Sequence, residues 1–249
     1  MNGKCKYMNF STTFNPVAGI TQKFINNSQC ALGDRFSNPN ILPVPDMIQD
    51  DVPRIISNSN DGYSKIILSK INCSVSANFD DDWSNDWIKC MQYFENCIST
   101  AKEIAATLET DDKLMLKFLG ITTKLFYDIN DAVHLLENHI INAQLNNICD
   151  IDLQVTQVIQ DRYYINIRIA NSRLFDNNIN PLSCGFLENN YTNGICVTID
   201  INNRYAFSKG LTRDKECNLI EIETIKSLLQ ETIESLPEIF GKEVFNEKK

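Results

Sequence analysis

The sequence predicts an α+β fold in which a mainly antiparallel sheet carries helices packed on one face, in the order β-α-β-β-β-α-β-α-β-β-β-α. Segments with strand-like alternation follow one another in runs, and segments with helical periodicity separate these runs. An Asp-Gly pair between two of the strand-like segments is typical of an antiparallel hairpin. The 249 residues are 43% hydrophobic, so we expect one α+β unit over residues 1–249. The pattern also admits two lobes that meet near residues 110–130.

The first part of the chain predicts a strand, a helix and a long loop. Residues 6–14 alternate in polarity and indicate a strand. Asn15 and Pro16 then suit an N-cap and a first helical residue, so we expect a helix over residues 16–27. Residues 33–53 contain four prolines, which forbid regular strand pairing and indicate a loop.

A β-hairpin is expected next, within two or three antiparallel strands over residues 54–79. Its turn is Asn60-Asp61-Gly62, because an Asp-Gly pair tolerates the positive φ angles that a tight turn needs.

Three consecutive carboxylates, Asp80, Asp81 and Asp82, precede a predicted helix over residues 83–108. The helix is indicated by apolar residues at alternating spacings of four and three: Trp87, Met91, Phe94, Ile98, Ala101, Ala105 and Leu108. Carboxylates at a helix start accept hydrogen bonds from unpaired backbone N–H groups, so we interpret the cluster as a cap. A divalent cation site is the alternative, although the loop glycine of a calcium-binding loop is missing.

The second part of the chain repeats the mixture of strands and helices. A long strand over residues 113–127 changes its apolar parity at Gly120, which predicts a β-bulge there. The remaining elements are expected as a helix at 131–144, strands at 150–159 and 162–175 joined at Gln160-Asp161, an Asn-rich excursion at 176–193, a strand at 194–201 and a helix at 219–240. The inner face of the last helix is predicted to consist of Ile222, Ile225, Leu229, Ile233, Leu236 and Phe240.

Common catalytic patterns are missing from the sequence. The two histidines, His134 and His139, lie five apart and therefore about 140° apart around a helix, which excludes one shared metal. Nine cysteines are an odd number without any C-x-x-C pair, and Cys90 and Cys97 fall close to the apolar stripe of a helix, so we expect buried thiols. No phosphate-binding loop, dinucleotide fingerprint, G-x-S-x-G or H-E-x-x-H motif occurs. We therefore expect no catalytic residues and no cofactor.

Carboxylates on strands are the remaining candidates for chemistry. Asp150 and Asp152 face the same side of a strand and could share a proton or a cation, or they could simply be the exposed start of that strand. The metal-site candidates are thus Asp80, Asp82, Asp150 and Asp152. Asp200 has the opposite parity to its apolar neighbours in the strand, and we expect it to face solvent.

The distribution of charged and apolar residues argues against nucleic acid and membranes as partners. The formal net charge is −9, and no cluster of Lys and Arg is available for a phosphate backbone, so direct binding of nucleic acid is not expected. No run approaches about 18 apolar residues and no leader-like segment begins the chain, so we expect a cytoplasmic protein that does not enter a membrane. The oligomeric state is left open.

Several segments resemble one sporadically distributed, uncharacterised prokaryotic protein family of about this length. They are PRIISNSNDGYSKIILS, FLGITTKLFYDIN, and VTIDIN followed by the helix ETIKSLLQETIESLPEIF. The similarity spans residues 7–240. It implies a full-length α+β unit, and the patchy distribution of the family implies an association with mobile or defence loci.

Two functions follow as hypotheses. The first is a non-catalytic interaction or regulatory protein whose acidic surface meets a protein partner. The alternative is a small-molecule binder or a metal-assisted hydrolase that uses paired carboxylates.

Overall fold

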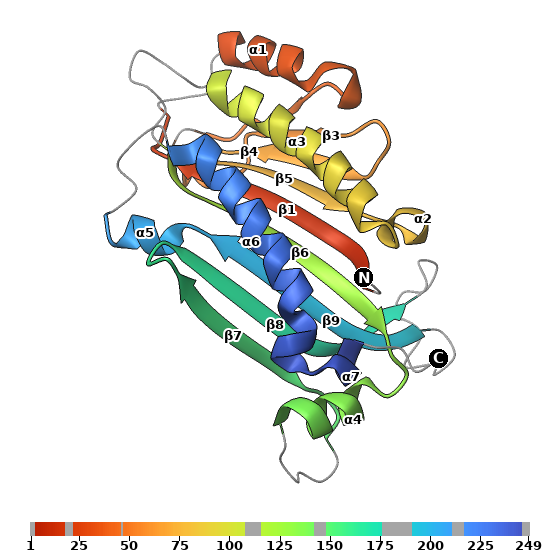
Figure 1. Cartoon of the computed structure of the whole chain (residues 1–249). Helices are drawn as coiled ribbons and strands as arrows, with labels where there is room; N and C mark the ends of the chain where they lie inside the picture. Colours follow the sequence, from red (N-terminus) through yellow and green to blue (C-terminus); the bar gives the residue numbers. More distant parts are fainter. Residues whose placement is uncertain are drawn as a thin grey trace.

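Nine strands of the described chain form one antiparallel sheet, which confirms the predicted α+β class (Figure 1). The computed structural model describes residues 3–17, 22–45, 47–107, 116–141, 148–175, 191–210 and 217–245. In sheet order the strands are β2 (Asn40–Ile41), β3 (Ile55–Asn58), β4 (Ser64–Leu68), β5 (Asn72–Asn78), β1 (Lys4–Phe14), β6 (Leu116–Asp128), β9 (Tyr191–Asn202), β8 (Tyr163–Phe175) and β7 (Asp152–Ile159).

The chain passes twice through the same plan, and β1 and β6 pair at the centre of the sheet. The first half runs β1, α1, β3, β4, β5, α2, α3, and the second half runs β6, α4, β7, β8, β9, α5, α6. The helices are α1 (Gln22–Leu32), α2 (Asp81–Ser84), α3 (Trp87–Thr107), α4 (Ala132–Leu136, continued by a π turn, Glu137–Ile141), α5 (Arg204–Ser208), α6 (Cys217–Phe240) and α7 (Lys242–Phe245). A short 3-10 turn, η1 (Gly33–Arg35), follows α1.

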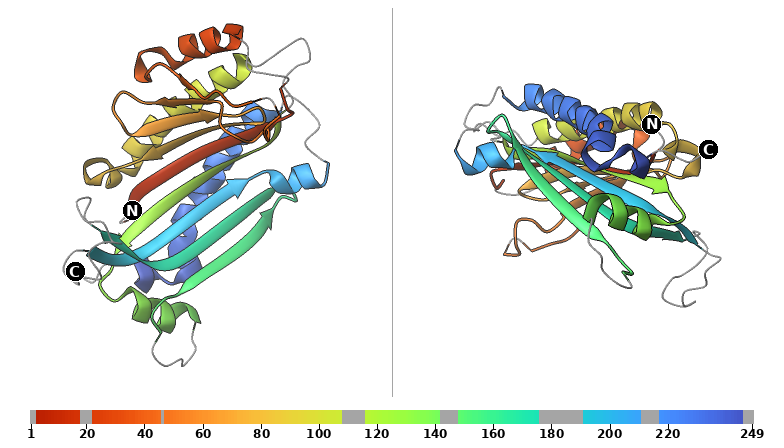
Figure 2. Two further views of the ribbon diagram at one scale, coloured as in Figure 1. Left: turned by 180° about the vertical axis from the view of Figure 1, so that it is seen from behind. Right: turned by 60° about the horizontal axis from the view of Figure 1, so that its bottom comes forward.

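The long helices lie on one face of the sheet. Helix α3 packs on β5 and β1, α6 packs on β6 and β9, and α1 packs on α3. Residues of alternate parity on the central strands, such as Phe10, Ile121 and Ile199, are buried beneath these helices. The reverse view shows that no helix of the described chain crosses the other face of the central strands (Figure 2). The predicted inner face of α6 is confirmed, because all six of its residues are buried.

Turn chemistry is predicted well by local sequence. Gly62 has φ of 82° in the turn between β3 and β4. Gln160 and Asp161 have φ of 55° and 50°, as a two-residue turn between β7 and β8 requires. Both hairpins therefore occur where the sequence predicts them.

The predicted bulge is wrong in position: the pairing of β6 with β1 shifts three residues before Gly120, where Thr13 pairs with Phe118 and Phe14 pairs with Leu116. Gly120 pairs in regular register with Ser11 on one side and Asn202 on the other. The apolar parity changes because Phe118 points to the face opposite Leu119, where its ring lies 5.7 Å from that of Phe207 in α5. A side chain at position 120 would meet neighbouring backbone and side-chain atoms, since an added Cβ would lie 2.7 Å from the Asn202 Cβ.

The prediction that Pro16 begins a helix is also wrong. Residues 15–17 are not helical, and the Val17 N–H donates to the Lys70 carbonyl at 3.0 Å. This bond holds the segment against the turn between β4 and β5. The described part of α1 begins at Gln22.

Some predicted segments lie partly outside the described residues. Residues 176–190 of the Asn-rich excursion are among them, whereas residues 191–193 begin β9. The same holds for Leu108 of the predicted helical stripe and for residues 142–144 of the helix with the histidines. No helix in the described part of the chain combines the length and apolar character needed to cross a bilayer.

Candidate functional site

A cavity of about 330 Å³ opens where the turn between β3 and β4 meets helix α3. It is lined by residues 34–36, by residues 59–61 with Ser64, and by Tyr93, Asn96 and Cys97 of α3. The volume is near the lower end of the range of about 300–1,000 Å³ that is typical of ligand pockets. Two carboxylates, Asp34 and Asp61, and one guanidinium, Arg35, line the cavity, so its formal charge is negative.

The hairpin itself fixes the Asp61 carboxylate. Its Oδ1 accepts a hydrogen bond from the Ser59 hydroxyl at 2.6 Å and one from the Tyr63 N–H at 3.0 Å. The Gly62 N–H donates to the Ser59 carbonyl at 3.1 Å, which closes the turn. These bonds are local, because aspartate in a turn commonly binds the backbone two residues on.

Helix α3 adds a third donor to the same carboxylate oxygen. The Tyr93 hydroxyl donates to Asp61 Oδ1 at 2.9 Å and lies 2.9 Å from the Ser64 hydroxyl oxygen. Cys97 Sγ donates to that Ser64 oxygen at 3.5 Å. Because the Tyr93 hydroxyl has one proton and donates it to Asp61, the Ser64 hydroxyl donates to the Tyr93 oxygen. The hydrogen bonds from Cys97 to Ser64, from Ser64 to Tyr93 and from Tyr93 to Asp61 then all point toward the carboxylate. Within the described chain, none of these hydrogen bonds uses the other carboxylate oxygen, Oδ2.

Three titratable groups of the cavity, Asp61, Tyr93 and Cys97, have pKa values that are shifted away from reactivity at neutral pH. Burial tends to raise the pKa of Asp61, but hydrogen bonds from Ser59, Tyr63 and Tyr93 outweigh it and hold this pKa below the usual carboxyl value. Burial raises the pKa of Tyr93 to about 12. Burial also raises the pKa of the Cys97 thiol. An ionised carboxylate of low basicity beside a neutral phenol and a neutral thiol is suited to binding and poorly suited to proton transfer or nucleophilic attack.

An aromatic cluster holds Tyr93 in place from the other side. Tyr63, Phe79, Trp83 and Tyr93 pack with ring centroids 5.1–6.5 Å apart. The Tyr63 hydroxyl donates to Asp80 Oδ2 at 2.6 Å, and this bond is the main reason why the pKa of Tyr63 is raised to about 12. The Lys89 ammonium lies 3.8 Å above the Trp83 ring, in a cation–π contact. The cluster joins the hairpin, α2 and α3, which makes the position of Tyr93 rigid.

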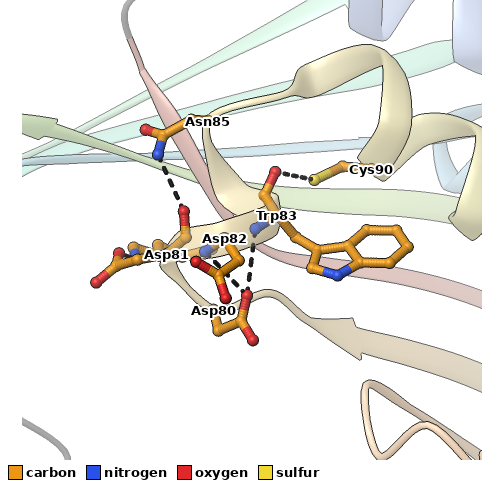
Figure 3. Close-up of polar contacts among 7 residues, drawn as sticks. Asp80, Asp81, Asp82, Trp83, Asn85 and Cys90 are labelled. Carbon is orange, nitrogen blue, oxygen red and sulfur yellow. Dashed lines mark hydrogen bonds and ion pairs between the residues drawn. The ribbon is translucent and has the colours of Figure 1, made fainter.

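The structure places the Asp80–Asp82 cluster at the start of the short helix α2 (Figure 3). Asp80 Oδ1 accepts from the N–H groups of Asp82 and Trp83 at 3.1 and 3.2 Å, so Asp80 is an N-cap as predicted. Asp81 forms an ion pair with Lys6 at 2.5 Å. This pair lowers the Asp81 pKa.

The predicted single helix over residues 83–108 needs a correction. The chain leaves the helix at Asn85 and Asp86, and the long helix α3 begins at Trp87. The Asp86 carboxylate accepts from the Lys89 N–H at 3.0 Å, which is the position of an N-cap bond for α3. The cluster therefore caps a separate turn of helix, and the cap of the long helix is Asp86.

In the structure, Asp150 and Asp152 bind different side chains. Arg168 binds both carboxylate oxygens of Asp152, and this pair lowers the Asp152 pKa. The Asn171 amide donates to Asp150 at 3.0 Å. Each carboxylate thus has its own partner, in place of a shared proton or cation. In the described residues, no three His, Cys, Asp or Glu side chains come together as potential metal ligands.

Asp200 lies on the predicted face of β9 but is not freely exposed. Its carboxylate accepts from Thr122, Asn166 and Asn202 at 2.8–3.0 Å, and the residue is half-buried. Both histidines are exposed on α4 and its continuation. Cys90 and Cys97 are buried, as predicted, whereas Cys30 and Cys149 are exposed, so the prediction of buried thiols is wrong for these two.

Sequence reasoning identified Asp61 only as a turn residue and missed Tyr93. The available signal was the Asp-Gly turn together with aromatic residues at 63, 83 and 93 that fall outside or beside the apolar stripe of the helix. The sequence matches no protein-family model, and no curated protein matches it either. The resemblance to the sporadically distributed prokaryotic family therefore stays a prediction.

Proposed function

We propose that the chain is a non-catalytic binding protein whose cavity at Asp61 and Tyr93 receives a small organic cation. The observation that carries the proposal is the Asp61 carboxylate, which three donors fix through Oδ1 at the wall of a cavity of about 330 Å³. An ionised carboxylate with a free oxygen is a natural partner for an ammonium or guanidinium group.

The charge and size of the cavity support a cation of metabolite size. Asp34 and Asp61 outnumber Arg35 among its charged residues, and the whole chain is acidic, which favours the approach of positive ligands. Phe36 and the ring of Tyr93 supply apolar surface beside the polar groups, as in most small-molecule sites.

Binding is favoured over catalysis by the pKa shifts. A general base works best with a pKa near the working pH, whereas Asp61 is shifted downward and Tyr93 upward. A role as a ligand sensor or carrier fits these shifts better than a hydrolytic role does.

The test is a thermal-shift screen of primary amines, guanidines and amino acids against the wild-type protein and Asp61→Asn. At about 100 times its Kd, a true ligand adds about 2.7 kcal/mol of stability and raises the wild-type Tm by several degrees. Asp61→Asn removes the same charge as the control Asp150→Asn, but only the former should abolish the shift. Equal shifts in both variants would exclude Asp61 as the cation partner.

A protein partner is a second candidate, and the edge strand β7 favours it. Val155 and Val158 of this strand are 49% and 39% exposed, and the strand pairs only with β8 in the described chain. An exposed edge can pair with an extended segment of another protein. Loss of partner capture in Val155→Lys, with capture retained in Ile88→Lys on α3, would support this role. Capture that is equal in the two variants would contradict it.

A further inference from the structure

The lining of the cavity at Asp61 changes from charged groups near solvent to apolar groups in the interior. The three charged residues of this lining, Asp34, Arg35 and Asp61, are exposed. Phe36 and Cys97, by contrast, are 5% exposed each and supply apolar surface. A ligand that fills the cavity therefore meets charges of both signs at its outer end and apolar surface at its inner end.

Arg35 lines the same cavity as Asp61 but forms no ion pair with it. In the part of the chain that the structure describes, the Arg35 guanidinium has no carboxylate partner. The pKa of the Cys97 thiol is raised chiefly by burial, and the Asp61 charge raises it further whereas the Arg35 charge opposes the rise. Both charges are thus within electrostatic reach of one thiol at the inner end of the cavity.

The hairpin turn holds the segment that carries Arg35 in place. The Asn60 N–H donates to the Arg35 carbonyl at 2.8 Å. An isolated β-bridge joins the next residue, Phe36, to Ser59. Because Asn60 directly precedes Asp61, the backbone positions from which the two opposite charges extend are fixed before a ligand binds, which lowers the cost of binding.

A zwitterion fits this arrangement better than a simple cation does. An ammonium ion without a carboxylate would use Asp61 and would leave the Arg35 guanidinium without a partner. A guanidinium is well suited to a carboxylate, because its planar fork donates two parallel hydrogen bonds. A free α-amino acid carries an ammonium and a carboxylate next to one side chain, which matches two charges of opposite sign above an apolar interior.

We propose that the cavity binds a free α-amino acid with an apolar side chain, whose ammonium pairs with Asp61 and whose carboxylate pairs with Arg35. This inference rests on the proposed function, because it names the kind of organic cation that the cavity receives. The side chain of the amino acid lies against Phe36 and Cys97. The second carboxylate of the lining, Asp34, adds to the attraction for the ammonium.

The test compares L-leucine, L-methionine and L-phenylalanine with their C-terminal amides, by isothermal titration calorimetry of the full chain at a pH of about 6.5. At this pH the α-amino group is largely protonated, and only the amino acid of each pair carries a carboxylate. In the wild-type protein, at least one of the three amino acids should bind about tenfold more tightly than its amide.

Arg35→Gln should remove this preference. It should weaken binding of the amino acid about tenfold and leave binding of the amide nearly unchanged, because only the amino acid loses a charged partner. Arg204→Gln is the matched control, since it removes an exposed arginine from α5 in the other half of the chain, and it should keep the preference.

The possible outcomes distinguish this inference from the proposed function. If the amides or other amines bind and Asp61→Asn abolishes their binding, but no amino acid binds more tightly than its amide, the inference is wrong and the cation site stands. A preference that persists in Arg35→Gln, or that is lost equally in Arg204→Gln, would also overturn the inference. If no amino acid, amide or amine binds to the wild-type protein, the proposed function is itself wrong.

Discussion

The two halves of the molecule use the same junction of hairpin and helix in different ways. In the first half, Asp61 of the β3–β4 hairpin accepts from Tyr93 of α3, and a cavity of about 330 Å³ remains beside them. In the second half, Arg162 at the β7–β8 hairpin forms an ion pair with Glu221 of α6. Glu221 is 3% exposed, so this second junction is closed by a buried carboxylate.

Asn203 completes the closed junction. Its amide nitrogen donates to Glu221, and its carbonyl oxygen accepts from the Leu119 N–H at 2.8 Å. The Asn203 side chain thus links α6 to the central strand β6. The first junction stays open: among the described residues no ion pair fills it, and the Asp61 carboxylate accepts from α3 only through the Tyr93 hydroxyl. The same framework therefore leaves a cavity where no ion pair of the described residues fills the space above the hairpin, and this cavity is the proposed binding site.

Removing Glu221 should have the largest effect on stability. Glu221→Ala leaves the Arg162 guanidinium and the Asn203 amide without their acceptor, and we expect a loss of about 2–4 kcal/mol of unfolding free energy, reduced somewhat because Arg162 is 30% exposed. Urea denaturation measures the loss. Glu223→Ala, which removes an exposed carboxylate two residues away, should cost about 0–1 kcal/mol. Similar losses in the two variants would show that the closed junction is not stabilising.

A substitution at Gly120, on the central strand β6, should have the next largest effect on stability. Gly120→Ala puts a methyl group 2.7 Å from the Asn202 Cβ and 3.0 Å from the Ile201 carbonyl oxygen, and overpacking of this kind costs about 1–3 kcal/mol. Ser11→Ala, on the strand opposite, loses one hydrogen bond from Asn72 and should cost less. An unchanged urea midpoint for Gly120→Ala would show that β6 and β9 can move apart without cost.

Tyr93→Phe should cost only about 1–2 kcal/mol, because one hydroxyl is lost and the ring remains within its aromatic cluster. Tyr205→Phe is the matched control, since its hydroxyl has no hydrogen bond in the described chain, and it should leave the unfolding free energy nearly unchanged. If Tyr93→Phe lost as much unfolding free energy as Glu221→Ala, the open junction at Asp61 would contribute as much to stability as the closed junction at Glu221.

The smallest expected effect is the change that Tyr93→Phe makes in the pKa of Asp61. Its pKa in the folded protein is lowered, so its contribution to stability is present above the unfolded pKa and is lost as pH falls through the folded pKa. Tyr93→Phe removes one of the donors and should raise the Asp61 pKa toward the usual value, making the acid loss of stability shallower. Carboxyl ¹³C NMR measures this titration directly. Identical titrations in the two proteins would remove Tyr93 from the network.

Much of the fold could be predicted because periodicity and turn chemistry are local properties. The inner stripe of α6 and the turns at Gly62 and Gln160-Asp161 are examples. The bulge was predicted three residues too late, because the register shift lies between Leu116 and Phe118, and because Phe118 contacts Phe207, 89 positions farther along the chain. The alternation of apolar residues along one strand reflects burial on both faces of the sheet, so it does not show which of the two faces covers a given residue.

The site was hidden for a related reason. Asp61 has a sufficient local explanation as a turn residue, and its contact with Tyr93 joins positions 32 apart. Long-range packing, which a single sequence does not reveal, decides which polar residues are left facing a cavity.

Backbone-amide NMR during titration with the strongest binder from the thermal-shift screen tests whether an organic cation binds at the open junction, beside Asp61, and not at the closed junction, beside Glu221. We expect saturable shifts of the amide signals of Asp61, Tyr93 and Cys97, with none at Arg162 or Glu221, and no shifts in Asp61→Asn. Shifts centred on Arg162 and Glu221, or shifts at Asp61 that persist in Asp61→Asn, would contradict it.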